Sequence, residues 1–384
     1  MADAIALLLA GAAAGQVALT LLLLGAQPGR TGAHLVLAAI LIVLGALAGT
    51  PLAAAAFPDH RYGLYLGFVL AAIYLLMPLF WLYADTLTSQ EQGVRLRAAW
   101  PHLAAALPGL GGAILVVLLP AGDRHSLFIE GTLSGNTQAE VTALALYSLV
   151  LLWCALSAGY LTAILWRLAA YRRRLRDLFS NNDQRELHWL SALMIGLGFV
   201  WLIAAAALLA DNIVGPLPVD GRLPAGLLVG LISVLALFGL RQRPGFENRQ
   251  GEGEPLVKYG KSALGAEQAS RIAARLETAM AKDHLYLDPS LSLQKLSRHL
   301  GVPANLMSQT LNQTIGESFF DHVNRWRVRA AEPRIAAGQE TVLEIALDVG
   351  FNSRSTFYGA FRKVTGQTPR DYRRAGNTGP IARQ

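Results

Sequence analysis

Seven long runs of apolar residues constrain this chain more than any other feature of its sequence. Each has about 18 residues or more, the length at which an α-helix crosses the hydrocarbon core of a membrane. They are Ala4–Gly25, Leu35–Ala54, Tyr62–Tyr83, Leu103–Leu119, Val141–Trp166, Leu190–Leu209 and Leu223–Leu240. Only 15% of the 384 residues are charged, whereas soluble proteins have about 25%. Residues 1–240 therefore predict a bundle of seven transmembrane helices.

Prolines interrupt two of these runs, at Pro51 in the second and Pro108 in the fourth. A bundle tolerates both, because neighbouring helices can bond the carbonyl groups that a proline leaves free. Asp3 is the only charged residue before the first run. A cleaved signal peptide begins with basic residues, so we expect this run to be a span.

The basic residues between the runs predict the orientation of the spans. One set of loops holds three of them, Arg61, Arg124 and Arg222. The opposite set holds nine, which are Arg30, Arg95, Arg97, Arg167, Arg172, Arg173, Arg174, Arg176 and Arg185. Because basic loops stay in the cytoplasm, we expect the N-terminus outside and everything after Leu240 inside. The chain is therefore expected to be a multi-pass protein of the cytoplasmic (inner) membrane.

The sequence changes character after Leu240. Residues 241–262 combine Gly, Pro and charges of both signs without apolar periodicity, which is typical of a flexible linker. Apolar residues then return at helical spacing over 263–376, and we expect 377–384 to be a disordered tail. From Lys258 to Arg374 there are 17 Lys and Arg against 11 Asp and Glu, a basic excess that suits nucleic acid without requiring it.

The region after the linker predicts a first helix-turn-helix motif. Ser292 is placed to cap a short helix, Gly301 to end it and Pro303 to begin the next. The expected buried residues of the pair are Leu293, Leu296, Leu300, Met307 and Leu311. Two short helices around a glycine-containing turn form such a motif.

The same pattern recurs towards the C-terminus. Thr341 and Glu344 form a predicted capping box, and Asn352 or Ser353 is placed to cap the following helix. The expected buried residues are Ile345, Ala346, Val349, Phe357 and Phe361. Between the two motifs, residues 318–331 predict a linking helix with Phe319, Val323 and Trp326 inward.

Two stretches of this region carry a family resemblance. "GVPANLMSQTLNQTIGESFFDHVNRWRV" and "TVLEIALDVGFNSRSTFYGAFRKVTGQTPRDYR" resemble the DNA-binding domain of the AraC/XylS transcription regulators, over about 115 residues. The features most specific to this family are the glycine-phenylalanine turn, the paired phenylalanines and the Thr-Pro pair near the end of the second stretch. The apolar half, followed by "KYGKS" and "GESFFDHVN", resembles the branch of that family with a multi-span N-terminal region.

The resemblance implies two recognition helices, each in a major groove, about one helical turn of DNA apart. Residues that face away from the buried pairs would then reach the bases, and these are Asn305, Ser308, Gln309, Ser353, Arg354 and Tyr358. Arg354 can bond guanine through two hydrogen bonds, and Asn305 or Gln309 can bond adenine. Phosphate contacts are expected from Arg325, Ser355, Arg362 and Lys363. The alternative is that all of them are solvated polar side chains.

Two prolines depart from the pattern of the family. Pro303 stands where the family usually has a serine cap, which removes about 1 kcal/mol of capping energy. Pro333 lies where the linking helix of the family continues. A proline inside a helix costs about 3 kcal/mol, so we expect the helix to end or kink there, which leaves the relative placing of the two motifs open.

The apolar half contains no pattern that predicts catalysis, a cofactor or a metal. Its histidines lie near span ends and not at metal-ligand spacing, and Cys154 is expected to be a small buried residue. Uncharged span centres argue against an ion or proton relay. Gln16, Ser157 and Tyr160 are the most polar side chains within the spans, and we expect them to make interhelical hydrogen bonds.

One basic loop admits two interpretations. Residues 172–190, "RRRLRDLFSNNDQRELHWL", place Leu175, Leu178 and Phe179 among arginines. A helix that lies in the membrane interface is one interpretation. A surface on which the C-terminal domain docks is the other.

The sequence as a whole predicts an all-α protein that is not an enzyme. We expect a membrane-embedded one-component transcription regulator, in which the spans sense an unknown small-molecule or membrane signal and two motifs bind promoter DNA. The expected partners are double-stranded DNA, the lipid bilayer and a second copy of the chain. Two alternatives stay open: a transporter or lipid-binding protein with a regulatory DNA-binding appendage, and an interaction module whose motifs no longer contact DNA.

Overall fold

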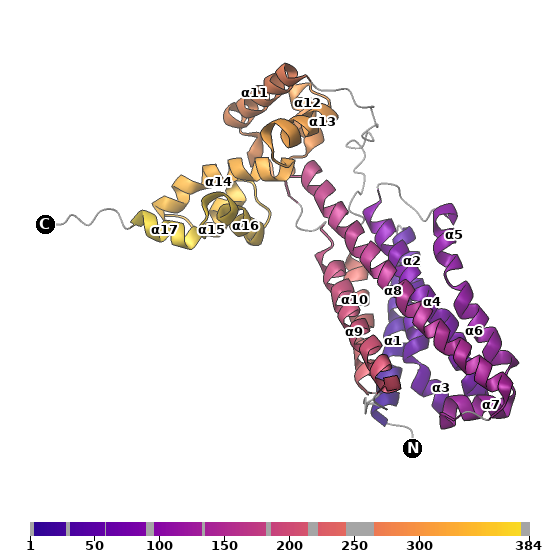
Figure 1. Ribbon diagram of the computed structural model, residues 1–384. Coiled ribbons are helices and arrows are strands. Elements are labelled where there is room, and N and C mark those ends of the chain that lie inside the picture. Colours follow the sequence, from indigo (N-terminus) through magenta and orange to yellow (C-terminus); the bar gives the residue numbers. More distant parts are fainter. Residues whose placement is uncertain are drawn as a thin grey trace. The chain divides into compact units, whose positions relative to one another are not determined.

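The computed structural model describes residues 4–27, 31–57, 59–89, 96–132, 135–181, 186–213, 222–242 and 265–377 (Figure 1). Every regular element in these ranges is a helix, and no strand forms in them. The predicted all-α fold is therefore confirmed. The chain divides into two compact units. The first comprises Met1–Leu168 and His188–Phe246, and the second comprises Ala169–Leu187 and Glu247–Gln384.

The first unit is a bundle of apolar helices. In it, α4 (Asp59–Thr88) packs against α2 (Gly32–Ala48) and α6 (Leu107–Leu118). α1 (Ala4–Ala26) packs against α2 and α10 (Arg222–Arg241). The remaining α-helices are α3 (Thr50–Ala56), α5 (Leu96–Ala104), α7 (Ala121–His125), α9 (His188–Ile213) and the part of α8 (Thr137–Leu178) that ends at Leu168, and a π-helical turn (Ser126–Glu130) follows α7.

Large apolar side chains cover the outside of this unit. Leu8, Leu22, Leu144 and Trp166 are each more than about two-thirds exposed, whereas Ala13 on α1 is fully buried. Helices that are apolar all round are typical of membrane spans, where small residues face the neighbouring helices. The packing is thus the arrangement expected of helices surrounded by lipid.

Five helices of the described part are long and apolar enough to cross a membrane, judged by length and composition. α2 and α3 are bent by 50° and make a sixth if they count as one span. The break falls at Gly49, Pro51 follows it in the first turn of α3, and Pro108 lies in the first turn of α6. All seven predicted runs lie on helices. Within the part of α9 whose side chains the structure describes, the apolar stretch His188–Ile203 is shorter than a span, so the count of seven stays a prediction.

The second unit contains short helices that begin at hydroxyl caps. Its helices are the end of α8, α11 (Ala266–Asp283), α12 (Leu293–Leu300), α13 (Ala304–Gln309), α14 (Phe319–Ala337), α15 (Val342–Asp348), α16 (Arg354–Thr365) and α17 (Pro369–Asn377). Ser292, Ser318, Thr341 and Ser353 each accept the backbone N–H three residues later. The predicted Ser292 cap and Thr341–Glu344 capping box are confirmed, and Ser353 rather than Asn352 caps α16.

Two hydrophobic cores lie along α14, with α11, α12 and α13 on one and α15, α16 and α17 on the other (Figure 1). Phe319 and Val323 belong to the first core. Val328, Ala331 and Ile335, further along the helix, belong to the second. One continuous helix therefore carries both motifs.

Of the two outcomes expected at Pro333, an end of the linking helix is wrong, and a kink there stays a prediction. α14 continues through Pro333 to Ala337 and ends at Gly338, whose φ is 69°. Ala331 and Ile335, on either side of the proline, are fully buried in the second core. The free energy gained by burial of these side chains offsets the cost of the backbone hydrogen bond that the proline cannot make.

Most of the predicted linker and tail lies outside the described residues. Of the linker 241–262, the structure describes Arg241, which ends α10, and Gln242. Of the tail 377–384, it describes only Asn377, the last residue of α17. The domain boundaries at these segments stay predictions.

Candidate nucleic-acid interface

α12 and α13 form the first helix-turn-helix motif. Gly301 ends α12 with a left-handed φ of 60°. Met307 of α13 and Leu311 of the π-helical turn that follows it (Thr310–Ile315) are buried in the first core. Pro303 precedes α13 and supplies no side-chain cap, as the sequence predicted. Burial of Met307 and Leu311 therefore fixes this helix without a cap.

The outer face of α13 carries short polar side chains. Asn305 is exposed, and Ser308 and Gln309 are half-buried. Gln309 Nε2 donates to Gln313 Oε1 over 2.9 Å, and Asn312 Nδ2 donates to Ser308 Oγ over 3.4 Å. Amides and hydroxyls both donate and accept hydrogen bonds, so this face presents the groups that can pair with base edges.

α15 and α16 form the second motif around a turn at Gly350. The φ of Gly350 is 98°, and a Cβ there would lie 2.7 Å from the Tyr286 backbone oxygen, so the turn requires glycine. Phe351 packs edge-on against Phe357, with ring centroids 5.2 Å apart. Phe357 and Phe361 are fully buried and fix α16 on the second core.

Arg354 and Tyr358 lie one turn apart on α16, with the arginine exposed and the tyrosine half-buried against the second core. Arg354 Nη2 donates to Tyr358 Oη over 3.0 Å, and its guanidinium lies 5.0 Å from the centre of the tyrosine ring. These two contacts hold an exposed arginine against the tyrosine side chain, which lowers the entropy it loses on binding. Ser353, by contrast, accepts the Thr356 N–H as the helix cap, so its hydroxyl is already engaged.

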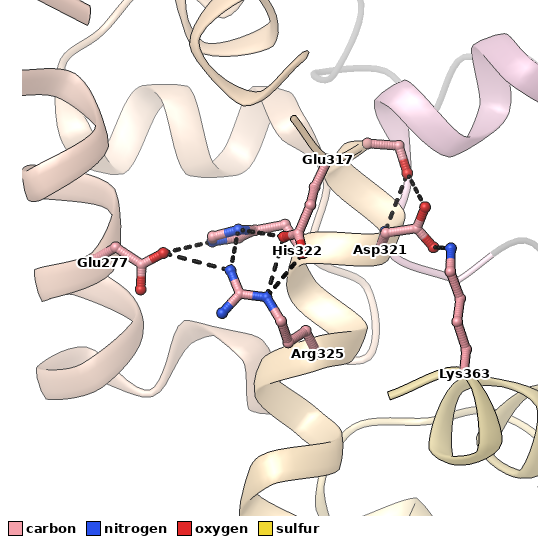
Figure 2. A network of polar contacts seen from close by, with 7 residues as sticks. Glu277, Glu317, Asp321, His322, Arg325 and Lys363 are labelled. Carbon is pink, nitrogen blue, oxygen red and sulfur yellow. Dashed lines mark hydrogen bonds and ion pairs between the residues drawn. The ribbon is translucent and has the colours of Figure 1, made fainter. Parts of the chain in front are cut away.

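The expected phosphate contacts on α16 differ in their surroundings. Ser355 and Arg362 are exposed, and Arg362 forms no ion pair with any other residue of the described part. Lys363 Nζ lies 2.7 Å from Asp321 Oδ1 and so joins α16 to α14 (Figure 2). With 63% of its side chain exposed, the lysine still faces solvent.

The structure places Arg325 in a half-buried ion-pair network within the domain. Its Nε donates to Glu317 Oε1 over 3.0 Å, and its Nη2 lies 3.6 Å from Glu277 Oε1 (Figure 2). Only 19% of the side chain is exposed. Two carboxylates thus neutralise the charge, an arrangement that joins α14 to α11 and argues against a phosphate contact.

His322 is the buried centre of the same network. Its Nδ1 lies 3.3 Å from Glu317 Oε2, and Arg325 Nη2 lies 3.2 Å from the same nitrogen (Figure 2). Burial lowers the pKa of His322 below its ordinary value of 6.5, the nearby Arg325 charge lowers it further, and Glu277 and Glu317 act in the opposite direction. The neutral imidazole is therefore the favoured form in the folded domain.

Arg327 is a buried residue that the sequence interpretation missed. Its side chain is fully buried between the two cores, and its five N–H groups all have acceptors. These are Tyr286 O (2.7 Å), Asp288 O (2.9 Å), Ser180 O (3.1 Å), Ser180 Oγ (3.2 Å) and Asn324 Oδ1 (3.2 Å). Burial lowers its pKa to about 9, and the guanidinium stays charged at neutral pH.

A signal for Arg327 was present in the sequence. Phe319, Val323, Arg327 and Ala331 recur every four residues along α14 and share its inward face. A charge within an apolar stripe indicates a buried residue with dedicated partners. What the stripe does not reveal is that Ser180 is one of those partners.

The comparisons with known proteins concern the C-terminal part of the chain. A family model described as a helix-turn-helix domain matches residues 296–375. An uncharacterized HTH-type transcriptional regulator of Staphylococcus aureus strain COL is 33% identical over 89 residues, 23% of this chain and 12% of the relative. A protein of Streptomyces lividans, named as an AraC-like transcription regulator, is 31% identical over 98 residues, 25% of this chain and 32% of the relative.

The similarity covers only part of each protein. The matched residues span about a third or less of the length of these relatives. No solved structure matches the chain significantly. Together, the two motifs on α14 and the matches over 296–375 identify the C-terminal part of this chain as a helix-turn-helix domain of the AraC type.

Proposed function

We propose that the chain is a membrane-embedded one-component transcription regulator that binds promoter DNA sequence-specifically. The observation that carries this proposal is the sharing of α14 by two helix-turn-helix motifs, each with a polar outer face, in one chain with a unit of five to six candidate spans. The relatives over this part are named as transcriptional regulators, which supports the role.

In this proposal the second helix of each motif lies in a major groove. Asn305, Ser308 and Gln309 read bases from α13, and Arg354 reads a guanine from α16, with Tyr358 beside it. Ser355, Arg362 and Lys363 hold phosphates and so set the position of α16 on the duplex. Ser353 contributes through its cap, which fixes where α16 begins.

The first unit spans the cytoplasmic membrane, with the N-terminus outside and the helix-turn-helix domain in the cytoplasm. The support is the basic bias of nine arginines against three, together with the apolar exterior of the unit. The spans sense a signal that favours one of two arrangements of the protein, which requires that the signal bind one arrangement more tightly. Pairing of two copies through the spans is one way to achieve this.

Selection of bound duplexes from a random DNA library tests the proposal. The full chain in lipid nanodiscs is the selecting protein, and an empty nanodisc is the control. We expect enrichment of a sequence with two half-sites whose centres lie about 10–10.5 base pairs apart, since each recognition helix occupies one groove. Recovery of unenriched DNA after several rounds would contradict the proposal.

Protease digestion of sealed membrane vesicles tests the location separately. Cleavage of the helix-turn-helix domain is expected in inside-out vesicles and not in right-side-out vesicles. The opposite pattern would contradict the orientation, and recovery of the chain in the soluble fraction would contradict membrane embedding.

A further inference from the structure

The end of α8 belongs structurally to the helix-turn-helix domain. Within the second unit, Leu175 is fully buried and Leu178 packs on the first core. The guanidinium of Arg176 lies 5.9 Å from the centre of the Phe320 ring on α14. We call Leu175–Asn181 the clamp segment. Of the two interpretations of this basic loop, docking of the domain is therefore confirmed for these residues.

The clamp segment binds the start of the first motif through its backbone. The N–H of Ser180 donates to Leu291 O over 3.2 Å, and its hydroxyl donates to the same oxygen over 2.7 Å. Phe179 pairs with Ser292 in an antiparallel bridge. Since Ser292 caps α12, the segment is attached at the first turn of the motif.

The clamp segment also binds the turn of the second motif. Asn181 Nδ2 donates to Pro289 O over 2.6 Å and to Gly350 O over 3.1 Å. Gly350 lies in the turn between α15 and α16, whereas Pro289 precedes the first motif. One amide group therefore connects the turn of the second motif to the segment that leads into the first.

Arg327 also contacts the clamp segment, the segment ahead of the first motif and the second motif. Two of its five acceptors are the oxygens of Ser180, two are backbone oxygens ahead of the first motif, and its guanidinium lies 5.5 Å from the Phe351 ring of the second motif. Removal of the clamp segment would leave buried N–H groups of a charged side chain without acceptors. The junction between the motifs is thus complete only with Ser180 in place.

We propose that the clamp segment fixes the relative setting of the two helix-turn-helix motifs, so that the position of α8 controls how well both fit one DNA site. The clamp segment comprises the last turn of α8 and the three residues after it, and α8 is an unbroken helix from Thr137 to Leu178 whose residues up to Leu168 belong to the apolar unit. A displacement of α8 alters the contacts of Ser180 and Asn181, and these contacts hold the two motifs in their relative position. The regulatory part of this inference rests on the proposed DNA-binding function.

Two substitutions in the full chain in lipid nanodiscs test the clamp. Asn181→Asp keeps the shape but places a carboxylate against the oxygens of Pro289 and Gly350. Ser180→Ala removes the hydroxyl alone. Arg174→Ala is the matched control, because this arginine is exposed on the same helix. Hydrogen exchange at the Ser180 amide measures docking, and titration with the selected DNA site measures the fit of the motifs.

We expect the Ser180 amide to be protected in the parent chain and both substitutions to speed its exchange. They should also weaken binding of the two-half-site duplex at least about tenfold, while binding of a duplex with only one half-site changes about twofold or less. The control should match the parent in the exchange rate of the Ser180 amide and in its affinity for each of the two duplexes. A general structural defect would instead weaken binding to both duplexes equally. That result would overturn the proposal that the clamp segment fixes the relative setting of the two motifs.

Other outcomes are equally decisive. Rapid exchange at Ser180 in the parent chain would show that the clamp segment is not docked. Faster exchange in Asn181→Asp with unchanged affinity for the two-half-site duplex would show that docking does not set the motifs. If the parent chain selects no DNA, the proposed function fails, and the exchange measurement still decides whether the clamp is formed.

Discussion

Arg327 Nη1 donates to the backbone oxygen of Ser180 over 3.1 Å, although the two residues stand 147 positions apart in the chain. The contact brings a segment from the end of α8 into the junction between two helix-turn-helix motifs. Because Arg327 is fully buried with all five N–H groups bonded, each acceptor is required. The helix-turn-helix domain is therefore built from two separate parts of the sequence.

Arg327→Lys is expected to destabilise the second unit by about 2–4 kcal/mol. An ammonium group has three donors and cannot satisfy acceptors arranged around a planar guanidinium. Hydrogen exchange of α14 amides in increasing urea measures the change. Arg329→Lys, an exposed position on the same helix, is the control and should stay within about 0.5 kcal/mol of the parent. Equal effects of the two substitutions would contradict the role given to Arg327.

Gly350→Ala is expected to cost more than about 2 kcal/mol of folding stability. The new methyl group would meet the backbone oxygens of Tyr286 at 2.7 Å and Leu287 at 2.8 Å, at a φ that L-residues rarely adopt. Gly359→Ala is the matched control, since it lies within α16 with no atom within 4 Å of the added group. The same urea series should show Gly359→Ala unchanged or more stable by up to about 1 kcal/mol. A stable Gly350→Ala protein would show that the turn is not as tight as described.

The second unit should lose stability as the pH falls below 6.5. The pKa of His322 is lowered in the folded domain, so below 6.5 the unfolded chain takes up a proton that the folded one does not, and unfolding becomes easier. The groups facing this imidazole are Glu277, Glu317 and Arg325. Urea unfolding between pH 7.5 and 5 measures the slope. His322→Gln should flatten it, and an unchanged slope in that variant would assign the effect to other groups.

Arg362→Ala should weaken DNA binding to a similar degree on selected and scrambled duplexes. A phosphate contact carries no sequence information. Its loss reduces the magnitude of the slope of log affinity against log salt by about one. Titrations at several salt concentrations measure the slope of log affinity against log salt. Arg370→Ala on α17 removes an equally exposed arginine and should leave the slope unchanged. A loss confined to the selected duplex would mean that Arg362 reads a base.

Local signals explain why most of the helix-turn-helix domain could be predicted from the sequence. Ser292, Thr341 and Glu344 act within three residues of their partners, and Phe357 and Phe361 reveal a buried face by their spacing. The apolar runs likewise specify helices by composition alone. Each of these features depends on residues close together in the sequence.

Long-range contacts explain what could not be predicted. Ser180 looks like an ordinary loop residue until Arg327 and Leu291 surround it. Arg325 looks like a free cation in the sequence, but Glu277 from α11 and Glu317 neutralise it. Pro333 stays within a helix because its neighbours are buried in a core that other helices complete. In all three cases, packing between distant segments decides the outcome.

Sequence reading by the helix-turn-helix domain is tested by a titration of the full chain in nanodiscs against its selected duplex and a scrambled duplex, at two salt concentrations. We expect a preference for the selected duplex that persists at the higher salt. Arg354→Ala should reduce that preference about 5- to 150-fold, since a bidentate contact to guanine contributes about 1–3 kcal/mol. Equal binding of both duplexes that disappears at the higher salt, with or without Arg354, would mean that the domain attracts phosphates and reads no sequence.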